Sequence, residues 1–488
     1  MQKGNFFGIN FGTTNTAVVH LQSEEQGVRL AHLGEGGDYP FSSIVAVPKE
    51  GGLLKFGREV RKRREELSDE YEIFASMKSY LGTKKEFIAG TRRYTAAELT
   101  AEFLKSVKAY ILMKHREDIK EAGFAFPIDF SPEARRDLCK AAELAGISVK
   151  CFISESTAAY LASRQDVQAY SRVMVLDWGG GTFDISILDL KKNSVTEAAV
   201  YGDKIGGDDI DIELARRVHA EIVKKSKSAL RLAFDDMKPH ERDLMIARCE
   251  LAKINISDSD VDYDFSILNY GGFGHQTLTI DVDWFNRLVE PVIKRRILGA
   301  IDAALSRANL TPAGIDAIII IGGSSNLSSY ERAITNKFGA DKIILPEKRQ
   351  WSTAEGAALM QIIGGDFKLK DALGVLLSDG SVLSIFEANE DGVGTRAGPI
   401  TFSIVEENSH DARFIFVNKD DVGASNITYA KKAVPAKGFL MENISLSAEI
   451  GIDQIARINI SSSFMGKAPP VTVEINKLAF FYDTSNLN

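Results

Sequence analysis

The sequence predicts an α/β half of about 365 residues that is followed by an all-β module. Three observations support this fold class. Two short apolar runs, at 7–15 and 175–184, each end in a glycine turn that also carries threonine. Strand and helix patterns alternate up to Gly365, and period-two alternation of apolar and polar residues replaces them after residue 371. We therefore expect an α/β domain at residues 1–365, a short linker at 366–371 and a β domain at 372–488.

Bulk properties limit the classes of function. A chain of 488 residues is too long for one hydrophobic core. The net charge of −8 argues against general binding of nucleic acid or of anionic membranes. The start, Met1-Gln2-Lys3-Gly4-Asn5, leads into a strand without a cleavage-like site, and the three cysteines show no metal spacing. We expect reduced thiols, no membrane partner and a cytoplasmic location.

Helix signals in the α/β half occur at several points. Thr95 and Glu98 have the spacing of a capping box and predict a helix over 95–120. Ser131-Pro132-Glu133 starts another helix, with serine as N-cap and proline at the first helical position, and this helix ends at Gly146. Apolar residues recur every fourth position over 205–225, which predicts an amphipathic helix.

The rest of the α/β half continues this alternation. Ala317-Ile318-Ile319-Ile320-Ile321 predicts a fully buried strand that leads into a third glycine turn. The charge-dense stretch 59–72 is expected to be the solvated face of a helix. Further helices are expected at 240–255, 284–309, 328–338 and 352–363.

The two glycine turns carry the chemistry. Each follows an apolar strand and an amide or carboxylate side chain, Asn10 in the first case and Asp177 in the second. A tight glycine turn lets backbone N–H groups approach phosphate oxygens, and threonine hydroxyls add donors. Two such turns that face each other would hold a polyphosphate from both sides, and Asp177 is a suitable oxygen ligand for Mg²⁺ or its waters. A single turn of this kind would be an ordinary hairpin, but two similar ones favour a nucleotide site.

The motifs resemble those of the 70-kDa heat-shock chaperone family, whose ATPase domain has the actin-like fold with two ribonuclease-H-like lobes. The resemblance covers residues 5–480, and its β part begins at Ala372-Leu373-Gly374-Val375. Gly12-Thr13-Thr14-Asn15 resembles the first phosphate loop, and Asp177 to Asp184, with Gly180, Gly181 and Thr182, resembles the second. Further similar motifs are Ile153-Ser154-Glu155-Ser156-Thr157, Gly206-Gly207-Asp208-Asp209-Ile210-Asp211, and Gly322-Gly323-Ser324-Ser325.

The resemblance implies roles for particular side chains. Lys78 would place a positive charge beside the γ-phosphate, Glu155 would order metal-bound water, and the Thr182 hydroxyl would help to place the nucleophile. Asp177, with Asn10 beside it, would hold Mg²⁺ through water. Glu250, Lys253 and Ser257 would contact the adenosine sugar. Without the resemblance, Lys78 would be interpreted as a surface lysine and Glu250 with Lys253 as a surface pair.

The sequence also departs from the family pattern. Asn10 stands where the family has aspartate, so one negative charge near the metal is missing. Ile254 and Asn326 stand where the family has two arginines that stack on adenine, which would lower affinity by about one to two orders of magnitude. The linker 366–371 alternates charged with apolar residues, and, with Asn488 as the last residue, the protein is expected to lack the family's helical lid.

Two functions follow from this pattern. The first is a lidless molecular chaperone that binds ATP or ADP with Mg²⁺, hydrolyses ATP slowly and binds unfolded or extended apolar peptides. A J-domain co-chaperone and a nucleotide exchange factor would be its further partners. The second is a catalytically weak, nucleotide-dependent scaffold or regulator that binds one dedicated protein. The missing charge at Asn10, the lost arginines and the altered linker favour the scaffold. Retained hydrolysis is favoured by Lys78, Glu155, Asp177 and Thr182. A sugar kinase of the same superfold lacks support, because no sugar-binding signature is present.

Overall fold

The computed structural model divides the chain into two compact units. One consists of Met1–Leu190 with Glu197–Ile362, and the other of Lys191–Thr196 with Ile363–Asn488. The second unit therefore takes six residues from the middle of the chain, which the sequence did not predict. The structure describes residues 4–24, 27–36, 39–127, 130–225, 232–404, 410–418, 427–437, 439, 442–462 and 470–485.

The first lobe of the larger unit is built on a six-stranded sheet in the order β11-β10-β1-β2-β3, with β4 beside β2. A parallel pairing joins β1 to β10 and an antiparallel one joins β1 to β2, so the chain leaves β1 through a hairpin turn. The strands are β1 (Gly4–Phe11), β2 (Asn15–Glu24), β3 (Gly27–His32), β4 (Phe41–Ser42), β10 (Glu121–Phe126) and β11 (Ser148–Ser154).

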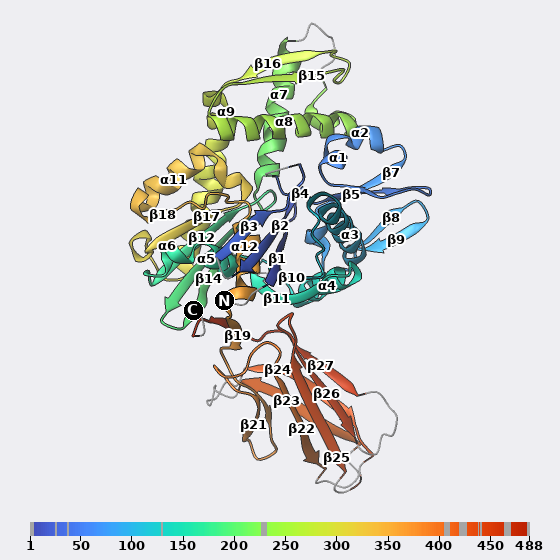
Figure 1. Cartoon of the computed structure of the whole chain (residues 1–488), viewed down its shortest axis with the longest axis vertical. Helices are drawn as coiled ribbons and strands as arrows, with labels where there is room; N and C mark the ends of the chain where they lie inside the picture. Colours follow the sequence, from blue (N-terminus) through green and yellow to red (C-terminus); the bar gives the residue numbers. More distant parts are fainter. Residues whose placement is uncertain are drawn as a thin grey trace. The chain divides into compact units, whose positions relative to one another are not determined.

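Smaller elements and helices complete this lobe (Figure 1). The helices α3 and α4 pack against each other, and α3 begins at a capping box formed by Thr95 and Glu98. The small strands are β5 (Ile44–Pro48), β6 (Lys55–Phe56), β7 (Tyr71–Ala75), β8 (Glu86–Ala89) and β9 (Arg92–Thr95). The helices are α1 (Gly57–Lys62), α2 (Arg64–Leu67), η1 (Met77–Tyr80), α3 (Ala96–His115), α4 (Pro132–Leu144), α5 (Glu155–Ala162) and α6 (Arg164–Val167).

The second lobe repeats the arrangement of the first. Its strands follow the order β18-β17-β12-β13-β14, with β12 parallel to β17 and antiparallel to β13. The strand β17 is buried along its whole length, as its isoleucine run predicts. The strands are β12 (Arg172–Trp178), β13 (Phe183–Lys191), β14 (Ser194–Asp203), β17 (Ala317–Ile321) and β18 (Ile343–Ile344).

Helices α7 and α8 pack against each other, and α8 also contacts the hairpin of β15 and β16 (Figure 1). The predicted helix 284–309 consists of two helices with a π-helical turn between them. The turn begins two residues after Pro291, whose missing N–H removes one helical hydrogen bond. The elements are α7 (Gly207–Lys225), η2 (Phe234–Asp236), α8 (Pro239–Ser259), β15 (Tyr263–Ile267), β16 (Gln276–Ile280), α9 (Val282–Val292), η3 (Ile293–Ile297), α10 (Leu298–Arg307), η4 (Pro312–Gly314), η5 (Gly323–Asn326), α11 (Ser328–Phe338), η6 (Ala340–Lys342) and α12 (Ser352–Ile363).

The second unit contains antiparallel strands, as its period-two pattern predicts. One four-stranded sheet has the order β21-β20-β23-β24 and another the order β22-β25-β26-β27. The linker region forms the strand β19, which pairs with β28 in antiparallel register. An ion pair between Lys368 and Asp483 and a ring contact between Phe367 and Tyr482 also join the two strands. The strands are β19 (Asp366–Leu369), β20 (Leu373–Leu376), β21 (Val382–Phe386), β22 (Arg396–Ser403), β23 (Asp411–Asn418), β24 (Thr428–Pro435), β25 (Asn443–Ile450), β26 (Ala456–Ser462), β27 (Val471–Ile475) and β28 (Phe480–Asp483).

Most predicted elements of the α/β half are present, including α3, α4, α7, α11 and α12. No helix among the described residues is both long enough and apolar enough to cross a membrane. The terminal Asn488, on which the prediction of a missing lid depended, lies outside the described residues.

Candidate functional site

The two glycine turns lie against each other. The first connects β1 to β2, and the second connects β12 to β13. A Cβ atom added to Gly180 would come within 2.1 Å of the Thr14 Oγ1 atom, and one added to Gly181 within 3.5 Å of Thr13. At Gly12, an added Cβ would come within 2.1 Å of the Asn15 carbonyl oxygen. Glycine is therefore required both for the shape of the first turn and for the close approach of the second turn to it.

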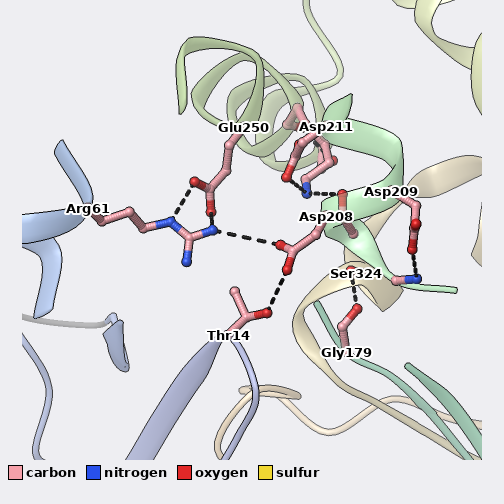
Figure 2. A network of polar contacts seen from close by, with 12 residues as sticks. Thr14, Arg61, Gly179, Asp208, Asp209, Asp211, Glu250 and Ser324 are labelled. Carbon is pink, nitrogen blue, oxygen red and sulfur yellow. Dashed lines mark hydrogen bonds and ion pairs between the residues drawn. The ribbon is translucent and has the colours of Figure 1, made fainter. Parts of the chain in front are cut away.

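Two further segments, the start of α7 and the short helix η5, hold the second turn in place. The N–H groups of Gly207 and Asp208 donate to the carbonyl oxygens of Gly179 and Gly180 at 3.1 and 2.8 Å. The Ser324 hydroxyl also donates to the Gly179 carbonyl, at 2.8 Å (Figure 2). A Cβ atom on Gly206 would come within 2.0 Å of the Gly180 carbonyl oxygen, so this glycine also permits close packing.

The turns open on a cavity of about 870 Å³. This volume is within the usual range for sites that bind small molecules or cofactors. Gly206 and Gly207 do not line the cavity, and Gly206 packs against the second turn instead. The other predicted site residues line the cavity. The predicted residues on its wall are Asn10, Gly12, Thr13, Thr14, Asn15, Lys78, Glu155, Asp177, Gly180, Gly181, Thr182, Glu250, Lys253, Ser257, Gly322, Gly323 and Ser324.

Lys78 and Glu155 form a buried ion pair on the cavity wall. The Lys78 Nζ atom lies 2.8 Å from the Glu155 Oε1 atom, and the two side chains are only 8% and 11% exposed. Lys78 comes from the short helix η1, and Glu155 is the first residue of α5. The interpretation of Lys78 as a surface lysine is therefore wrong in this fold.

Asp177 lies near this pair, one residue before the end of β12. Burial raises the pKa of Asp177 well above its usual value, the nearby carboxylates of Glu155 and Asp184 raise it further, and Lys78 lowers it. Thr182 donates from its hydroxyl to Asp184 at 2.8 Å. A cation beside Asp177 would favour the charged form of the carboxylate.

Asn10 and Asp177 together suit a hydrated magnesium ion. The Asn10 Oδ1 atom is buried without a hydrogen-bond partner, and both residues line the cavity. An unpaired amide oxygen accepts hydrogen bonds well from metal-bound water. In the part of the chain that the structure describes, no group of three or more His, Cys, Asp or Glu side chains could hold a metal directly. The oxygen atoms present therefore fit an ion that keeps its own water shell.

An ion-pair network, drawn in Figure 2, crosses the cavity wall from the first lobe to the second. Arg61 on α1 contacts Glu250 on α8 through two nitrogen atoms, at 2.6 and 2.8 Å. Arg61 also lies 3.8 Å from Asp208, which accepts a hydrogen bond from the Thr14 hydroxyl at 2.9 Å. Arg61 and Glu250 are each 18% exposed, so the prediction that 59–72 is a solvated helix face is wrong for Arg61.

Lys253 is held close to this network. Its Nζ atom lies 2.7 Å from the Asp211 carboxylate and donates to the Gly207 carbonyl at 2.9 Å. Burial raises the pKa of Asp211 to about 7, while Lys253 opposes this shift. Ser257 donates to the Lys253 carbonyl and stays on the same helix face. The predicted sugar contacts Glu250, Lys253 and Ser257 thus lie together.

The end of the cavity predicted to hold the base contains Ile254 and Asn326, as the sequence indicates, and also Arg349. Arg349 donates to the Ser325 carbonyl at 2.7 Å and to Glu331 at 2.8 Å. A guanidinium group is therefore present at this end, although it comes from a different position in the chain. Arg61 and Arg349 were not predicted from the sequence, because neither forms a local pattern with its partner.

The comparisons with known proteins agree with this geometry. The family model described as "Hsp70 protein" matches residues 54–442, which is well over half of the chain. The chain belongs to the Hsp70 family. The α/β unit with the cavity is therefore an actin-like ATPase domain of the Hsp70 type, and the antiparallel β sheets after it correspond to the family's β module.

Two relatives of this Hsp70-family protein are distant in sequence. "Chaperone protein DnaK" from two strains of Halobacterium salinarum is 26% identical over 493 aligned positions. The alignment covers 97% of this chain and 76% of the relative. The protein is thus a divergent, chaperone-like member of the family.

Proposed function

We propose that this Hsp70-family protein binds Mg-ATP in the cavity, hydrolyses it slowly, and acts as a molecular chaperone whose β module binds extended apolar peptides. The contact between the two glycine turns at Gly180 and Thr14 is the observation that carries the proposal. Backbone N–H groups of the turns would donate to the phosphate oxygens, as in other glycine-rich phosphate sites. Glu250 and Lys253 would bind the sugar.

The chemistry that this site offers is positioning and charge stabilisation. A water molecule attacks the γ-phosphorus, and the bond to the bridging oxygen of ADP breaks. Lys78 would stabilise the charge on the phosphoryl oxygens, and Glu155 would hold Lys78 in place. The Thr182 hydroxyl would orient the water. Mg²⁺, when bound, would neutralise phosphate charge, and Asn10 and Asp177 would hold its water shell.

Among the residues that the structure describes, each four-stranded sheet of the β module ends in an outer strand with one strand neighbour. The strand β21 is an outer strand of its sheet, and Leu383 on it is 37% exposed. An extended peptide that pairs with such an edge gains backbone hydrogen bonds, and apolar side chains beside the edge give it selectivity. We propose unfolded or extended peptides as substrates, with a J-domain co-chaperone and a nucleotide exchange factor as regulators.

Two measurements test this function. Calorimetry with ATP and Mg²⁺ should show binding to the wild type and at least a tenfold loss with Gly180→Trp, because the indole would collide with Thr14. Equal affinities would show that the nucleotide binds elsewhere. ATP turnover should then rise when an unfolded peptide is added. Binding without turnover, together with one protein recovered in pull-down, would instead support the scaffold.

A further inference from the structure

Glu197 lies outside the 870 Å³ cavity but accepts hydrogen bonds from the start of α5, the helix that carries Glu155. It belongs to β14, and one of its carboxylate oxygens, Oε1, accepts hydrogen bonds from three hydroxyl groups. These come from Ser154 at 2.7 Å, Ser156 at 2.5 Å and Thr157 at 3.5 Å. The contacts join two segments that are about 40 residues apart in the chain.

The three hydroxyl groups belong to the start of α5, around Glu155. Ser154 is the N-cap of the helix, and its Oγ atom also accepts the Thr157 N–H at 3.2 Å. Glu155 is the first helical residue and has a bonded serine on each side. Its carboxylate points to Lys78 and forms the buried pair. The bonds to Glu197 therefore fix the backbone of Glu155 from both sides.

The two serine hydrogen bonds to Glu197 are short, whereas the Thr157 contact at 3.5 Å is long and weak. A carboxylate that accepts from hydroxyl groups forms charge-assisted bonds, which are shorter and stronger than neutral ones. Burial raises the pKa of Glu197, and the three hydroxyl groups oppose this shift. Ser156 also lines a cavity of about 20 Å³ together with Glu155, Asp177 and Asp184. Ser156 thus contacts Glu197 and also lines this small cavity with three acidic residues of the proposed active site.

We propose that Glu197 is a positioning residue for ATP hydrolysis: it fixes the first turn of α5 so that Glu155 stays paired with Lys78 beside the attacked phosphate. This inference rests on the proposed function. It assigns no contact between Glu197 and the nucleotide, because Glu197 does not line the large cavity.

The test compares three variants of the full chain. Glu197→Val removes the acceptor and should lower the single-turnover rate of ATP hydrolysis at least tenfold, which corresponds to about 1.4 kcal/mol. The dissociation constant for ADP should change less than threefold. Glu197→Gln keeps an oxygen acceptor and should retain at least a third of the wild-type rate. Thr196→Val, on the opposite face of the strand, is the matched control and should leave rate and affinity unchanged.

A second measurement applies even if Glu197→Val folds poorly. Ser156→Ala should lower the rate of ATP hydrolysis by three- to tenfold. The double variant with Ser156→Ala and Glu197→Gln should be slower than Glu197→Gln alone by about the same factor. Hydrogen exchange without nucleotide should show faster exchange of the Thr157 amide in Ser156→Ala and in Glu197→Val.

The outcomes separate the two proposals. A wild type that binds no nucleotide would overturn the proposed function and this inference with it. A wild type that hydrolyses ATP, with Glu197→Val equally fast, would overturn this inference alone. If the wild type binds ATP without hydrolysing it, unchanged exchange at Thr157 in Glu197→Val would overturn the positioning role. A loss of ADP affinity equal to the loss of rate would show a structural role only.

Discussion

The ion pair of Arg61 with Glu250 is expected to control nucleotide release. Arg61 belongs to α1 in the first lobe, Glu250 belongs to α8 in the second, and both line the cavity. Opening of the cleft between the lobes must separate these two side chains. Arg61→Met, which keeps most of the apolar stem but removes the charge, should therefore accelerate release of ADP.

The magnitude follows from burial and geometry. Exposed ion pairs contribute about 0–1 kcal/mol, whereas hydrogen bonds to charged groups contribute about 1.5–3 kcal/mol. With two nitrogen–oxygen contacts below 3 Å and 18% exposure on each side, the Arg61 pair belongs near the lower end of the second range. A loss of about 1.5–2 kcal/mol corresponds to release about 10- to 30-fold faster. The association rate should change much less.

The assay is stopped-flow release of a fluorescent ADP analogue, chased with excess unlabelled ATP. Arg63→Met is the matched control, because Arg63 is 47% exposed, pairs with Glu59 and Glu66 in its own segment, and does not line the cavity. Release from this control should equal that from the wild type. Release from Arg61→Met within twofold of the wild type would refute the reasoning, since the pair would then break without cost during opening.

Three further predictions concern single side chains in the cavity. Asn10→Asp should raise the single-turnover rate at least tenfold at saturating Mg²⁺ if the restored charge contributes about 1.4 kcal/mol. It should also weaken ADP binding without Mg²⁺, because Asp177 is already hard to ionise. No gain in rate would mean that the site is built around the amide. Lys78→Ala should lower the rate while ADP binding by calorimetry persists, and lost binding would reassign Lys78 to ground-state affinity. The unfolding temperature of Asp211→Asn minus that of the wild type should become more positive between pH 5 and pH 7 and then level off. The sign follows because the folded-state pKa of Asp211 is raised to about 7, so the unfolded chain loses this proton first and stability falls as pH rises through that window. A constant difference across the pH range would contradict this assignment.

Local sequence signals predicted much of the fold because the responsible interactions are local. The capping box of Thr95 and Glu98 defines the start of α3 within four residues. The buried isoleucines of β17 and the glycines after it can be interpreted without knowledge of any distant partner. The glycine turns were predicted on the same basis, and the structure adds that Gly180 lies against Thr14.

Long-range pairing was not predictable in the same way. Arg61 stands in a run of charges that has the same appearance whether it faces solvent or a cleft, and its partner Glu250 is 189 residues away. Glu197 lies in the strand β14, and the residues next to it in sequence form no motif. Its three hydroxyl donors lie at the start of α5, about 40 residues away. Residues 366–371 were predicted as a short linker, but residues 366–369 form the strand β19, whose partner β28 comes from the other end of the module. In each case, the sequence contains both partners but no local sign that they meet.

The charges in the cavity explain why an amide at position 10 is compatible with a nucleotide site. Glu155, Asp177 and Asp184 lie close together, and Lys78 is the cation that offsets them in the pKa of Asp177. An aspartate at position 10 would add a fourth negative charge to this group and would make it more dependent on a bound cation. The amide keeps an oxygen atom for metal-bound water and avoids that repulsion. We infer that Asn10 favours nucleotide binding at low Mg²⁺ at the expense of the hydrolysis rate, so the ratio of ADP affinities with and without Mg²⁺ should be smaller in the wild type than in Asn10→Asp.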